Sequence, residues 1–500
     1  DDNMKELYYK VVRDPVYSEV FLSPLEIIIS DTPNMQRLRY LSQLVGAEYV
    51  YPSATHTRFG HSVGVMHLSG LYAQHLYPYD YSKFRVLRLA GLMHDIGHGP
   101  YSHQFDDTVY KTMGYKDGHD EFRTRIIRGK LLEDTLSVYK NSSDPRIKND
   151  FIHDIELTLG IQTNEDNIHA NLQEIFEKVI QVYEGENTGS VDFNIVQGPL
   201  GADRLDFVLR DSYFAGTRHF GSGATDRLIR GSSISSDKIC YSIKVIDDVY
   251  TSLFARFMMY KNVYFHKTSR AADQMIQEVL RASYEVLNLK QRVEDPQQFV
   301  ELTDARIMDE IEILYQMLFE KKNYGMLIDP ELIRHAEKLS YAHSVIQRLK
   351  KRDLWKVIME IPFSTTGVDP SLINNSVGQN MLDAMKQKLK DLLVQEIPVQ
   401  DKTEITRILE EFETLFKIDT PYKLSLIHPS EFLANDVYIK DTNGDILGFD
   451  QMYEKYPAYR FMESNLIQIV RVYIKEDRRE ILKKYKVLPQ STSQKITTRW

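Results

Sequence analysis

One stretch of this chain, FRVLRLAGLMH at Phe84–His94, restricts the fold more than any other segment. Its residues are apolar around nearly the whole circumference of a helix, and such a helix is stable only where other elements cover it. Gly97, Gly99 and Pro100 follow and predict the end of the helix. We therefore expect one central buried helix that leads into the segment HDIGHGPYSH.

Helical spacing also governs most of the chain after Pro24. In Ser62–Leu76, for example, Val65, Leu68 and Tyr72 recur at the interval of helical turns. Residues 140–190 are polar and predict loops around a single helix. The helical patterns are predicted near residues 170–183, 248–288, 304–320, 330–359, 381–396 and 403–416.

Two segments predict β-hairpins by their alternation. Residues 8–22 alternate loosely between apolar and polar around Asp14-Pro15, and residues 234–247 repeat this pattern. We expect both hairpins to be small additions to a helical protein.

The last third of the chain mixes the two kinds of signal. Asn443-Gly444 between two apolar runs predicts a third hairpin within residues 436–449. Leu466–Ile474 is typical of a strand, whereas residues 363–380 predict a long loop or linker. The predicted fold is mainly α, with a helical core, small β-hairpins and a smaller α+β C-terminal region. We place the core at residues 1–360 and the C-terminal region, with a role in oligomerisation or regulation, at residues 361–500.

Composition restricts the class of protein. Of 500 residues, 42% are hydrophobic, which supports a large core, and the formal charge of −9 disfavours a general nucleic-acid coat. Small anionic substrates remain compatible, because a local basic pocket is enough to bind them. Cys240 is the only cysteine, so no intrachain disulfide can form. We find no apolar run of the ~18–20 residues that span a bilayer and no signal-peptide core. We therefore predict a cytoplasmic protein that does not engage a membrane.

Four residues form a candidate metal-binding set: His61, the adjacent pair His94-Asp95, and Asp203. Two imidazoles and two carboxylates suit iron, manganese, zinc, nickel or magnesium. They also leave coordination positions open for water or phosphate, as catalytic sites do. The clustering of His98 and other histidines in HDIGHGPYSH adds weight to this interpretation.

Structural alternatives remain open from spacing alone. A single histidine in an apolar helix is more often a satisfied core residue than a ligand. Asp203, Asp206 and Arg210 share one helix face, which is also the pattern of a solvated face with an intrahelical salt bridge.

Longer motifs carry a family resemblance. The stretches DTPNMQRLRYLSQL, YPSATHTRFGHSVGV, AGLMHDIGHGPYSHQFD and DRLDFVLRDSYFAG resemble those of the HD-domain deoxynucleoside triphosphate triphosphohydrolases (dNTPases). The resemblance includes the animal sterile-alpha-motif/HD enzyme, without its sterile-alpha-motif domain, and continues into RDLWKVI and RVYIKEDRREI. It implies metal-dependent hydrolysis of a dNTP to deoxynucleoside and inorganic triphosphate, on an HD-domain helical core.

The resemblance also implies roles for individual residues. His61, His94, Asp95 and Asp203 match the metal ligands, and Arg58 and Arg204 match phosphate-binding groups. The remaining matches are the active-site histidines His98, His103 and His119, the carboxylate Asp106, the sugar contacts Gln43 and Asp211, and the far wall Arg256, Tyr264 and Lys267. Phe207 and Tyr260 depart from the family, where tyrosine and histidine are usual.

A mechanism follows from this resemblance. Arg58, Arg204 and Lys267 would neutralise the triphosphate, with metal-activated water attacking the α-phosphate. His103, oriented by Asp106, would protonate the leaving group with His98 or His119 assisting. Tyr264 would exclude a ribose 2′-hydroxyl by steric clash, although a core tyrosine is the structural alternative.

Regulation is implied by a second set of matches. Lys10, Val11, Asp31 and Arg39 match a site for a guanine nucleotide, GTP or dGTP, between subunits of a homo-oligomer, a tetramer or dimer. The alternative for Asp31 is an N-cap of the helix that starts near Pro33. Two rival functions share some of these features: an HD phosphodiesterase or nuclease acting on cyclic nucleotides or single-stranded nucleic acid, and a non-catalytic nucleotide-binding scaffold.

Overall fold

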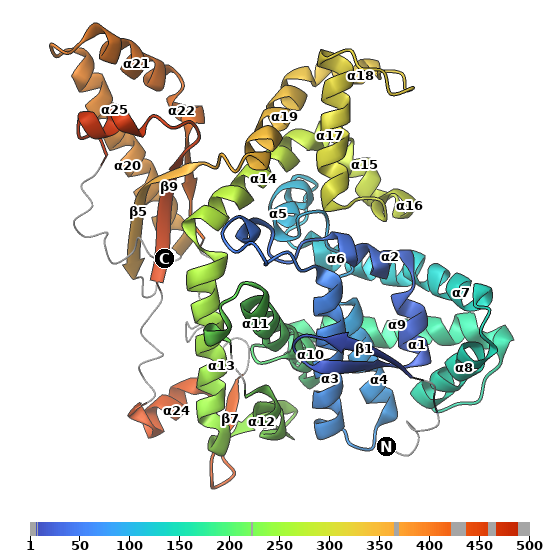
Figure 1. Cartoon of the computed structure of the whole chain (residues 1–500). Helices are drawn as coiled ribbons and strands as arrows, with labels where there is room; N and C mark the ends of the chain where they lie inside the picture. Colours follow the sequence, from blue (N-terminus) through green and yellow to red (C-terminus); the bar gives the residue numbers. More distant parts are fainter. Residues whose placement is uncertain are drawn as a thin grey trace.

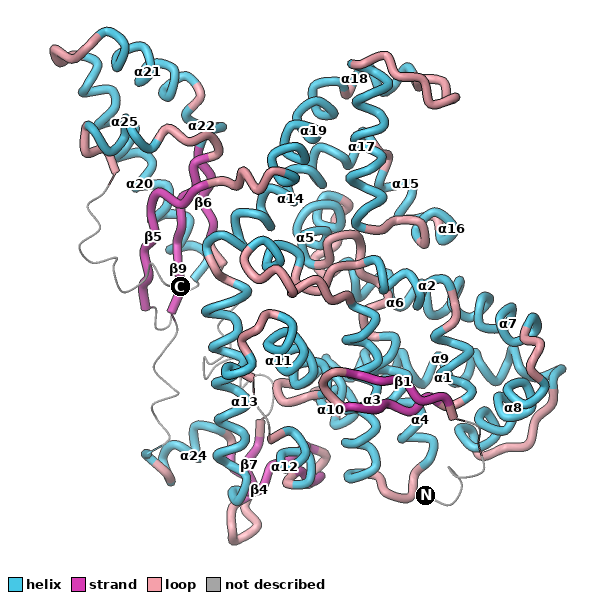
Figure 2. Tube along the Cα trace, viewed as in Figure 1, coloured by secondary structure: helices cyan, strands magenta, loops and turns pink. Residues whose placement is uncertain are grey.

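The computed structural model describes residues 7, 9–221, 224–364, 370–421, 437–458 and 467–488. Most of these residues lie in helices, and three small sheets are attached to them (Figures 1 and 2). The prediction of a mainly α fold with small β elements is confirmed. Among the described residues, none of the helices is both long enough and apolar enough to cross a membrane.

Residues 24–214 are mostly helical. Their helices are α1 (Pro24–Ser30), α2 (Pro33–Arg37), α3 (Arg58–Leu76), α4 (Tyr81–Met93), α5 (His103–Phe105), α6 (Gly118–Ile126), α7 (Leu132–Asn141), α8 (Pro145–Leu159), α9 (Ile168–Glu184), α10 (Val191–Gln197) and α11 (Ala202–Phe214). Shorter turns between them are η2 (Leu38–Tyr40), η3 (Val45–Tyr49) and the π-helical η4 (Asp106–Tyr110) and η5 (Ile127–Leu131).

The middle and the end of the chain continue the helical pattern. The middle helices are α12 (Thr225–Arg230), α13 (Ile246–Met259), α14 (Lys267–Val286), α15 (Leu289–Glu294), α16 (Pro296–Phe299), α17 (Asp304–Phe319), α18 (Pro330–Arg334) and α19 (Ala336–Lys350). A π-helical turn, η10 (Tyr260–Tyr264), joins α13 to α14. The later helices are α20 (Pro370–Leu393), α21 (Val399–Glu410), α22 (Phe412–Leu415), α24 (Phe449–Lys455) and α25 (Arg479–Lys484).

The strands form three separate sheets. The hairpin of β1 (Lys10–Asp14) and β2 (Ser18–Leu22) pairs Lys10 with Leu22. A second sheet has the order β3-β4-β7-β8 and a third the order β5-β9-β6. Their strands are β3 (Ser232–Ser235), β4 (Lys238–Ser242), β5 (Lys356–Ser364), β6 (Phe416–Asp419), β7 (Tyr438–Lys440), β8 (Ile446–Leu447) and β9 (Ile467–Ile474). The predicted hairpins and the predicted strand near residue 470 are therefore present.

The predicted central helix is α4, which packs along α3 at the heart of the main core (Figure 1). All its residues from Phe84 to Met93 are buried. Two of them are charged: Arg85 and Arg88 both contact the buried carboxylate of Glu26. Burial raises the pKa of Glu26, but the two guanidinium groups outweigh that effect and hold it at about 2. The helix is therefore buried all round because its arginines have paired partners inside the core.

Three predictions of secondary structure are wrong. Residues 140–190 contain a second helix, α8, which starts with Asp144 as N-cap and ends at the left-handed Gly160. Only Phe151 and Ile155 among its large apolar side chains are fully buried, so its apolar stripe was too narrow to recognise. Residues 356–359 belong to β5 rather than to a helix.

The predicted loop at residues 363–380 is the third error. Within it, β5 runs to Ser364 and α20 begins at Pro370, while residues 365–369 lie outside the described residues. Proline is well tolerated in the first turn of a helix, because its missing N–H has no partner there anyway. A polar composition thus concealed a helix start.

A second, smaller core lies in the C-terminal part, where α20 packs on the sheet of β5, β9 and β6, and α21 and α25 add apolar side chains to the same core. The segment of β7, β8 and α24 behaves differently. It packs on the main core: β7 pairs in parallel with β4, and Ile439 of β7 and Met452 of α24 are buried there. The division of the chain at residue 360 stays a prediction.

Candidate functional site

Three helix ends bring the predicted metal-binding residues together. His61 lies in the first turns of α3, His94 and Asp95 follow the last residue of α4, and Asp203 lies in the first turn of α11. The packing of α3 against both α4 and α11 places these ends side by side. Residues more than a hundred positions apart in the sequence therefore share one site.

The ring nitrogens of the two histidines face each other across this site. His61 Nε2 lies 3.2 Å from His94 Nε2 and 2.8 Å from Asp203 Oδ1. His94 Nε2 lies 3.3 Å from an oxygen of Asp95 and 3.3 Å from Asp203 Oδ1. The ligand atoms of His61, His94 and Asp95 are all close enough to hold one metal ion.

Hydrogen bonds on the far side of each ring decide which nitrogen faces the site. His94 Nδ1 lies 2.7 Å from the carbonyl oxygen of Gly91, which can only accept, so Nδ1 carries the proton. His61 Nδ1 donates in the same way to Asp206 Oδ2, at 2.7 Å. In each ring, Nε2 is therefore the nitrogen that faces the two carboxylates. Two imidazole nitrogens and two carboxylates that converge on one point form a donor set that fits a divalent cation.

The charges of the site affect the protonation of His61 and Asp95. Burial lowers the pKa of His61, but its hydrogen bonds to Asp203 and Asp206 raise it to about 10. Burial raises the pKa of Asp95, whereas His94, Arg58 and His98 hold it well below its usual range. A metal ion would therefore compete with a proton for His61 Nε2, so its binding is expected to release that proton.

Arg58 connects the metal-binding residues to the neighbouring turn. Its Nη1 donates to Asp95 Oδ2 at 2.8 Å, and its Nε donates to Ser102 Oγ at 2.7 Å. The side chain is almost fully buried. A fixed guanidinium beside the metal-binding carboxylate is well placed to hold an anionic substrate group.

Asp106 lies at the centre of a second cluster, formed by three histidines. Its Oδ2 atom is 3.1 Å from His119 Nδ1, 3.4 Å from His103 Nδ1 and 3.7 Å from His98 Nδ1. His98 stacks on His119 with a ring separation of 4.4 Å. The two clusters meet at His98, whose Nε2 lies 3.3 Å from Asp95 Oδ1.

The histidines of this cluster differ in exposure and charge. His98 is buried, and burial together with Arg58 holds its pKa well below the usual range. Burial lowers the pKa of His119, but the neighbouring Asp106 more than compensates and raises it to about 8. His103 is the exposed member, with 68% of its side chain accessible. It is thus the one that a bound substrate can reach most directly.

Gly97 allows this cluster to form. A side chain at this position would meet the carbonyl oxygen of His119 at 2.0 Å and the backbone of Arg123 at 2.5 Å. Only glycine lets the start of α6 approach so closely. Helix α4 ends at Met93, so His94 and His98 do not lie on a common helix.

A cluster of polar and aromatic side chains lies on α11, which also carries Asp203, and on the neighbouring η10. Asp211 accepts hydrogen bonds from Tyr264 at 2.5 Å and from His56 Nε2 at 2.6 Å. The buried Oε1 atom of Gln43 has no hydrogen-bond partner within the described part of the chain. Phe207 packs edge-on against Tyr264. Polar groups are therefore held in place beside an aromatic wall.

The remaining predicted substrate residues lie on α11, α13, η10 and α14. Arg204 and Arg256 line one small cavity between α11 and α13. Tyr260 contacts Tyr264 at a ring separation of 4.6 Å, and Lys267 is the first residue of α14. The residues that are predicted to contact phosphate, sugar and base thus all lie on elements that border the site.

The predicted activator residues gather at the N-terminal hairpin. Burial raises the pKa of Asp31, while the nearby Lys10 and Arg39 lower it. Val11 is 47% exposed on β1, and the guanidinium of Arg39 lies 4.0 Å from the ring centre of Phe59. Asp31 follows α1 and Thr32 precedes α2, so the alternative that Asp31 is an N-cap is wrong.

Asp206 and Arg210 form a buried ion pair on one face of α11. They form the expected i,i+4 pair, yet both are buried, so the alternative of a solvated face is wrong for them. Asp206 also accepts from the hydroxyl of Tyr17 at 2.6 Å. This face of α11 therefore fixes the orientation of His61 through Asp206.

Sequence reasoning missed His56, Ser102, Asp206 and Asp304 as supporting residues. His56 lies two positions before Arg58 within the motif YPSATHTRFGHSVGV, and its place in that motif could have indicated a role at the site. No sequence pattern indicates a role for Asp304, because its carboxylate accepts hydrogen bonds from segments that are distant in the sequence.

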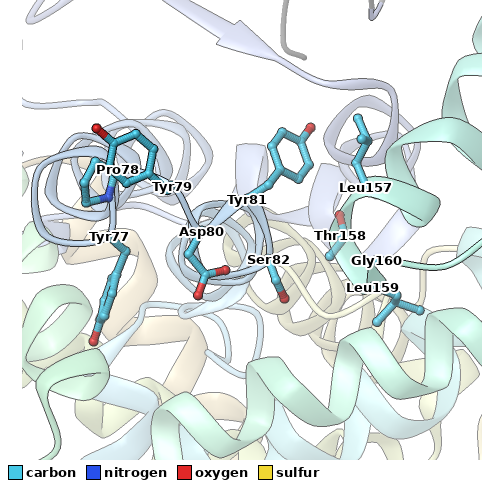
Figure 3. A pocket seen from close by; sticks show the side chains of 10 residues that line it. All are labelled: Tyr77, Pro78, Tyr79, Asp80, Tyr81, Ser82, Leu157, Thr158, Leu159 and Gly160. Carbon is cyan, nitrogen blue, oxygen red and sulfur yellow. The ribbon is translucent and has the colours of Figure 1, made fainter. Parts of the chain in front are cut away.

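A surface pocket at the opposite end of α3 and α4 lies outside this site (Figure 3). It is lined by Tyr77–Ser82 and the end of α8. Helix α4 separates Tyr81 from His94 by its whole length, about 20 Å at 1.5 Å per residue. None of the residues that line the pocket belongs to the metal-binding or histidine clusters.

Comparisons with known proteins agree with the geometry. The HD domain family matches residues 58–169, and the HD associated region matches residues 224–384. The SAMHD1 homolog of Dictyostelium discoideum, a deoxynucleoside triphosphate triphosphohydrolase, is 26% identical over 80% of this chain and 71% of its own length. The human deoxynucleoside triphosphate triphosphohydrolase SAMHD1 is 27% identical over 70% of this chain. The matched part is 55% of the human enzyme, so this chain spans little more than half of it.

Two solved structures share the fold. A phosphohydrolase from Bacteroides thetaiotaomicron is 20% identical with a TM-score of 0.62, covering 94% of this chain and 100% of its own. A hypothetical protein from Aquifex aeolicus is 22% identical with a TM-score of 0.60, covering 96% of this chain and 100% of its own. These likenesses establish the architecture of nearly the whole chain.

Proposed function

This chain is an HD-domain protein related to the deoxynucleoside triphosphate triphosphohydrolases, and from that premise we propose that it hydrolyses dNTPs to deoxynucleoside and inorganic triphosphate. The observation that carries the proposal is the convergence of His61 Nε2, His94 Nε2, Asp95 and Asp203 beside the histidines around Asp106. One cluster suits a metal ion and the other suits proton transfer. Hydrolysis of a phosphate ester can use both.

The metal-binding residues fit a divalent cation of the class manganese, magnesium, iron, zinc or nickel. Such a cation supplies Lewis acidity toward the α-phosphate and lowers the pKa of water. His61, His94, Asp95 and Asp203 would hold it. Arg58, Arg204 and Lys267 bind and neutralise the triphosphate, so that an anionic nucleophile can approach the α-phosphorus.

Proton transfer to the leaving group is assigned to His103. Water attacks the α-phosphorus, the bond from that phosphorus to the sugar O5′ breaks, and O5′ receives a proton from the His103 imidazolium. Asp106 orients His103 and stabilises its charge. His98 or His119 assists. Burial raises the pKa of Asp106, but the contacts with His103 and His119 hold it well below its usual range, so the carboxylate stays ionised. Because His103 is exposed, it can take up a new proton from solvent after each turnover.

Sugar selection is assigned to Gln43, Asp211 and Tyr264. Asp211 already accepts from Tyr264 and His56, which fixes its carboxylate for a further donor such as a sugar 3′-hydroxyl. Gln43 Oε1 offers a second unpartnered acceptor. The Tyr264 ring would exclude a 2′-hydroxyl by contact, and Phe207, Tyr260 and Arg256 would line the base and sugar side.

A chromatographic assay tests this function. The purified protein is incubated with each dNTP and Mn²⁺ or Mg²⁺, and products are resolved by anion exchange. Deoxynucleoside with inorganic triphosphate is expected. Monophosphate with pyrophosphate, or hydrolysis of a cyclic nucleotide instead, would favour the HD phosphodiesterase; nucleotide binding without turnover under any of these metals would favour a scaffold.

Activation by a guanine nucleotide is proposed for Lys10, Val11, Asp31 and Arg39. Asp31 could accept from guanine N1 and N2, and Arg39 could donate to O6. A homo-oligomer, tetramer or dimer, would bring this exposed surface against a second copy. The test adds GTP or dGTP to the assay and follows mass by light scattering; turnover and mass that do not change with GTP would refute activation.

A further inference from the structure

The turn that leads into His103 has a strained backbone. Tyr101 and Ser102 have φ angles of +62° and +56°, and Ser102 has a ψ angle of −120°. Residues other than glycine pay for this conformation, and it persists only where the surroundings enforce it. The turn separates His98 from His103, so its shape decides how the two imidazoles face Asp106.

Asp304, the first residue of α17, holds this turn through its carboxylate. Oδ1 accepts from the backbone N–H of Tyr101 at 2.6 Å, and Oδ2 accepts from that of Ser42 at 2.8 Å. One carboxylate therefore joins the strained turn to the segment before Gln43. Its charge is also favoured by its place at the N-terminus of a helix.

The same connection reaches the metal-binding residues. Ser102 Oγ donates to the carbonyl oxygen of Ser42 at 2.6 Å and accepts from Arg58 Nε. Arg58 in turn donates to Asp95. A displaced turn would therefore shift both His103 and Arg58.

Arg37 forms a second link between the same two regions. Its Nη1 donates to the carbonyl oxygen of His98 at 2.7 Å, and its Nε donates to that of Leu302 at 2.8 Å. Its guanidinium also stacks 4.2 Å from the ring centre of Phe299. Residues 299–304 thus back the turn at two points, and they belong to the HD associated region rather than to the HD domain match.

We propose that Asp304 is a positioning residue for the catalytic turn: it holds Tyr101 and Ser102 in their strained conformation and thereby aligns His103 and Arg58. The catalytic part of this inference rests on the proposed function. Through Asp304, the HD associated region then supports the active site at a residue that does not itself contact substrate.

Asp304→Asn tests the proposal with little change in shape, because asparagine offers one acceptor oxygen where two N–H groups need partners. The matched control is Asp309→Asn, an exposed aspartate on the same helix. Hydrogen exchange of a peptide spanning residues 99–105 reports the turn without any need for activity. We expect exchange there to quicken and kcat to fall about tenfold or more, as for loss of a hydrogen bond to a charged group. The bound metal per chain and the control variant should not change.

A second variant separates positioning from general stability. Glycine adopts a positive φ without strain, so Tyr101→Gly in the Asp304→Asn background should restore part of the lost kcat. A purely structural role for Asp304 predicts a further loss instead. No gain in the double variant would overturn the proposal, as would unchanged exchange or a kcat within twofold of wild type in Asp304→Asn.

The wild-type protein distinguishes this inference from the proposed function. If wild type releases no triphosphate from any dNTP, the proposed function fails, while faster exchange in Asp304→Asn still supports the hold on the turn. If wild type is active and Asp304→Asn is equally active, only the inference fails.

Discussion

The Nε2 atoms of His61 and His94 lie 3.2 Å apart, while the Nδ1 atom of each ring donates to an acceptor behind it, Asp206 and the Gly91 carbonyl oxygen. Both Nε2 atoms therefore face the same point, which a proton on His61 or a metal ion can occupy. The outer hydrogen bonds therefore orient both rings so that each Nε2 atom faces the position of a metal ion.

Removing one carboxylate should remove the metal. We expect Asp203→Ala to lose bound metal and turnover together, because two imidazoles and Asp95 alone provide a weaker set for a divalent ion. Elemental analysis after dialysis against metal, beside a turnover assay, measures both. Asp226→Ala, on α12 and outside the cluster, is the control; full metal content in Asp203→Ala would contradict the assignment.

His103 should affect chemistry more than binding. We expect His103→Ala to lower kcat by about 10²–10⁴-fold, the usual range for a general acid, with bound metal and nucleotide affinity retained. Rapid quench for turnover and equilibrium binding of a non-hydrolysable dNTP separate the two effects. His153→Ala, a partly exposed histidine on α8, controls for loss of a surface imidazole. Near-normal turnover in His103→Ala would count against a role as acid.

Asp211 should matter only to a substrate that carries a 3′-hydroxyl. We expect Asp211→Ala to lower kcat/KM for a dNTP by about 10–100-fold, since a hydrogen bond to a charged group is lost. The same variant should change kcat/KM little for the 2′,3′-dideoxy analogue. Equal losses of kcat/KM on both substrates would show that Asp211 stabilises the local structure and does not bind the sugar.

Asp273 should make stability depend on pH. Burial outweighs the nearby Arg270 and raises the pKa of Asp273 to about 7, against about 3.9 in the unfolded chain. Between these values the folded protein binds a proton that the unfolded chain does not, so its stability falls as pH rises from about 4 to about 7. Asp273→Asn removes this contribution and keeps an acceptor for the N–H of Gly46.

Thermal unfolding of wild type and Asp273→Asn at several pH values measures this effect. The Tm of the variant relative to wild type should become more favourable as pH rises from 5 to 8. Asp304 titrates in the same direction but is present in both proteins. A difference in Tm that stays constant with pH would refute the buried, raised carboxyl.

Much of the fold followed from local pattern. The apolar circumference of α4, the alternation in β1 and β2, and the Asn443-Gly444 turn each carry their signal within a few residues. Helix α8 and the start of α20 did not, because their polar composition outweighed narrow apolar stripes and a proline that suits a first helical turn.

The sequence by itself determined which residues are candidates, since His61, His94-Asp95 and Asp203 stand in motifs long enough to recognise. Only the tertiary structure decided how they act. The packing of α3 against α4 and α11 brings their side chains within 3–4 Å, and the outer hydrogen bonds of Asp206 and Gly91 select the ring nitrogen that faces the site. Asp304 became visible only there, because a carboxylate that bonds backbone N–H groups of distant segments leaves no periodic trace in sequence.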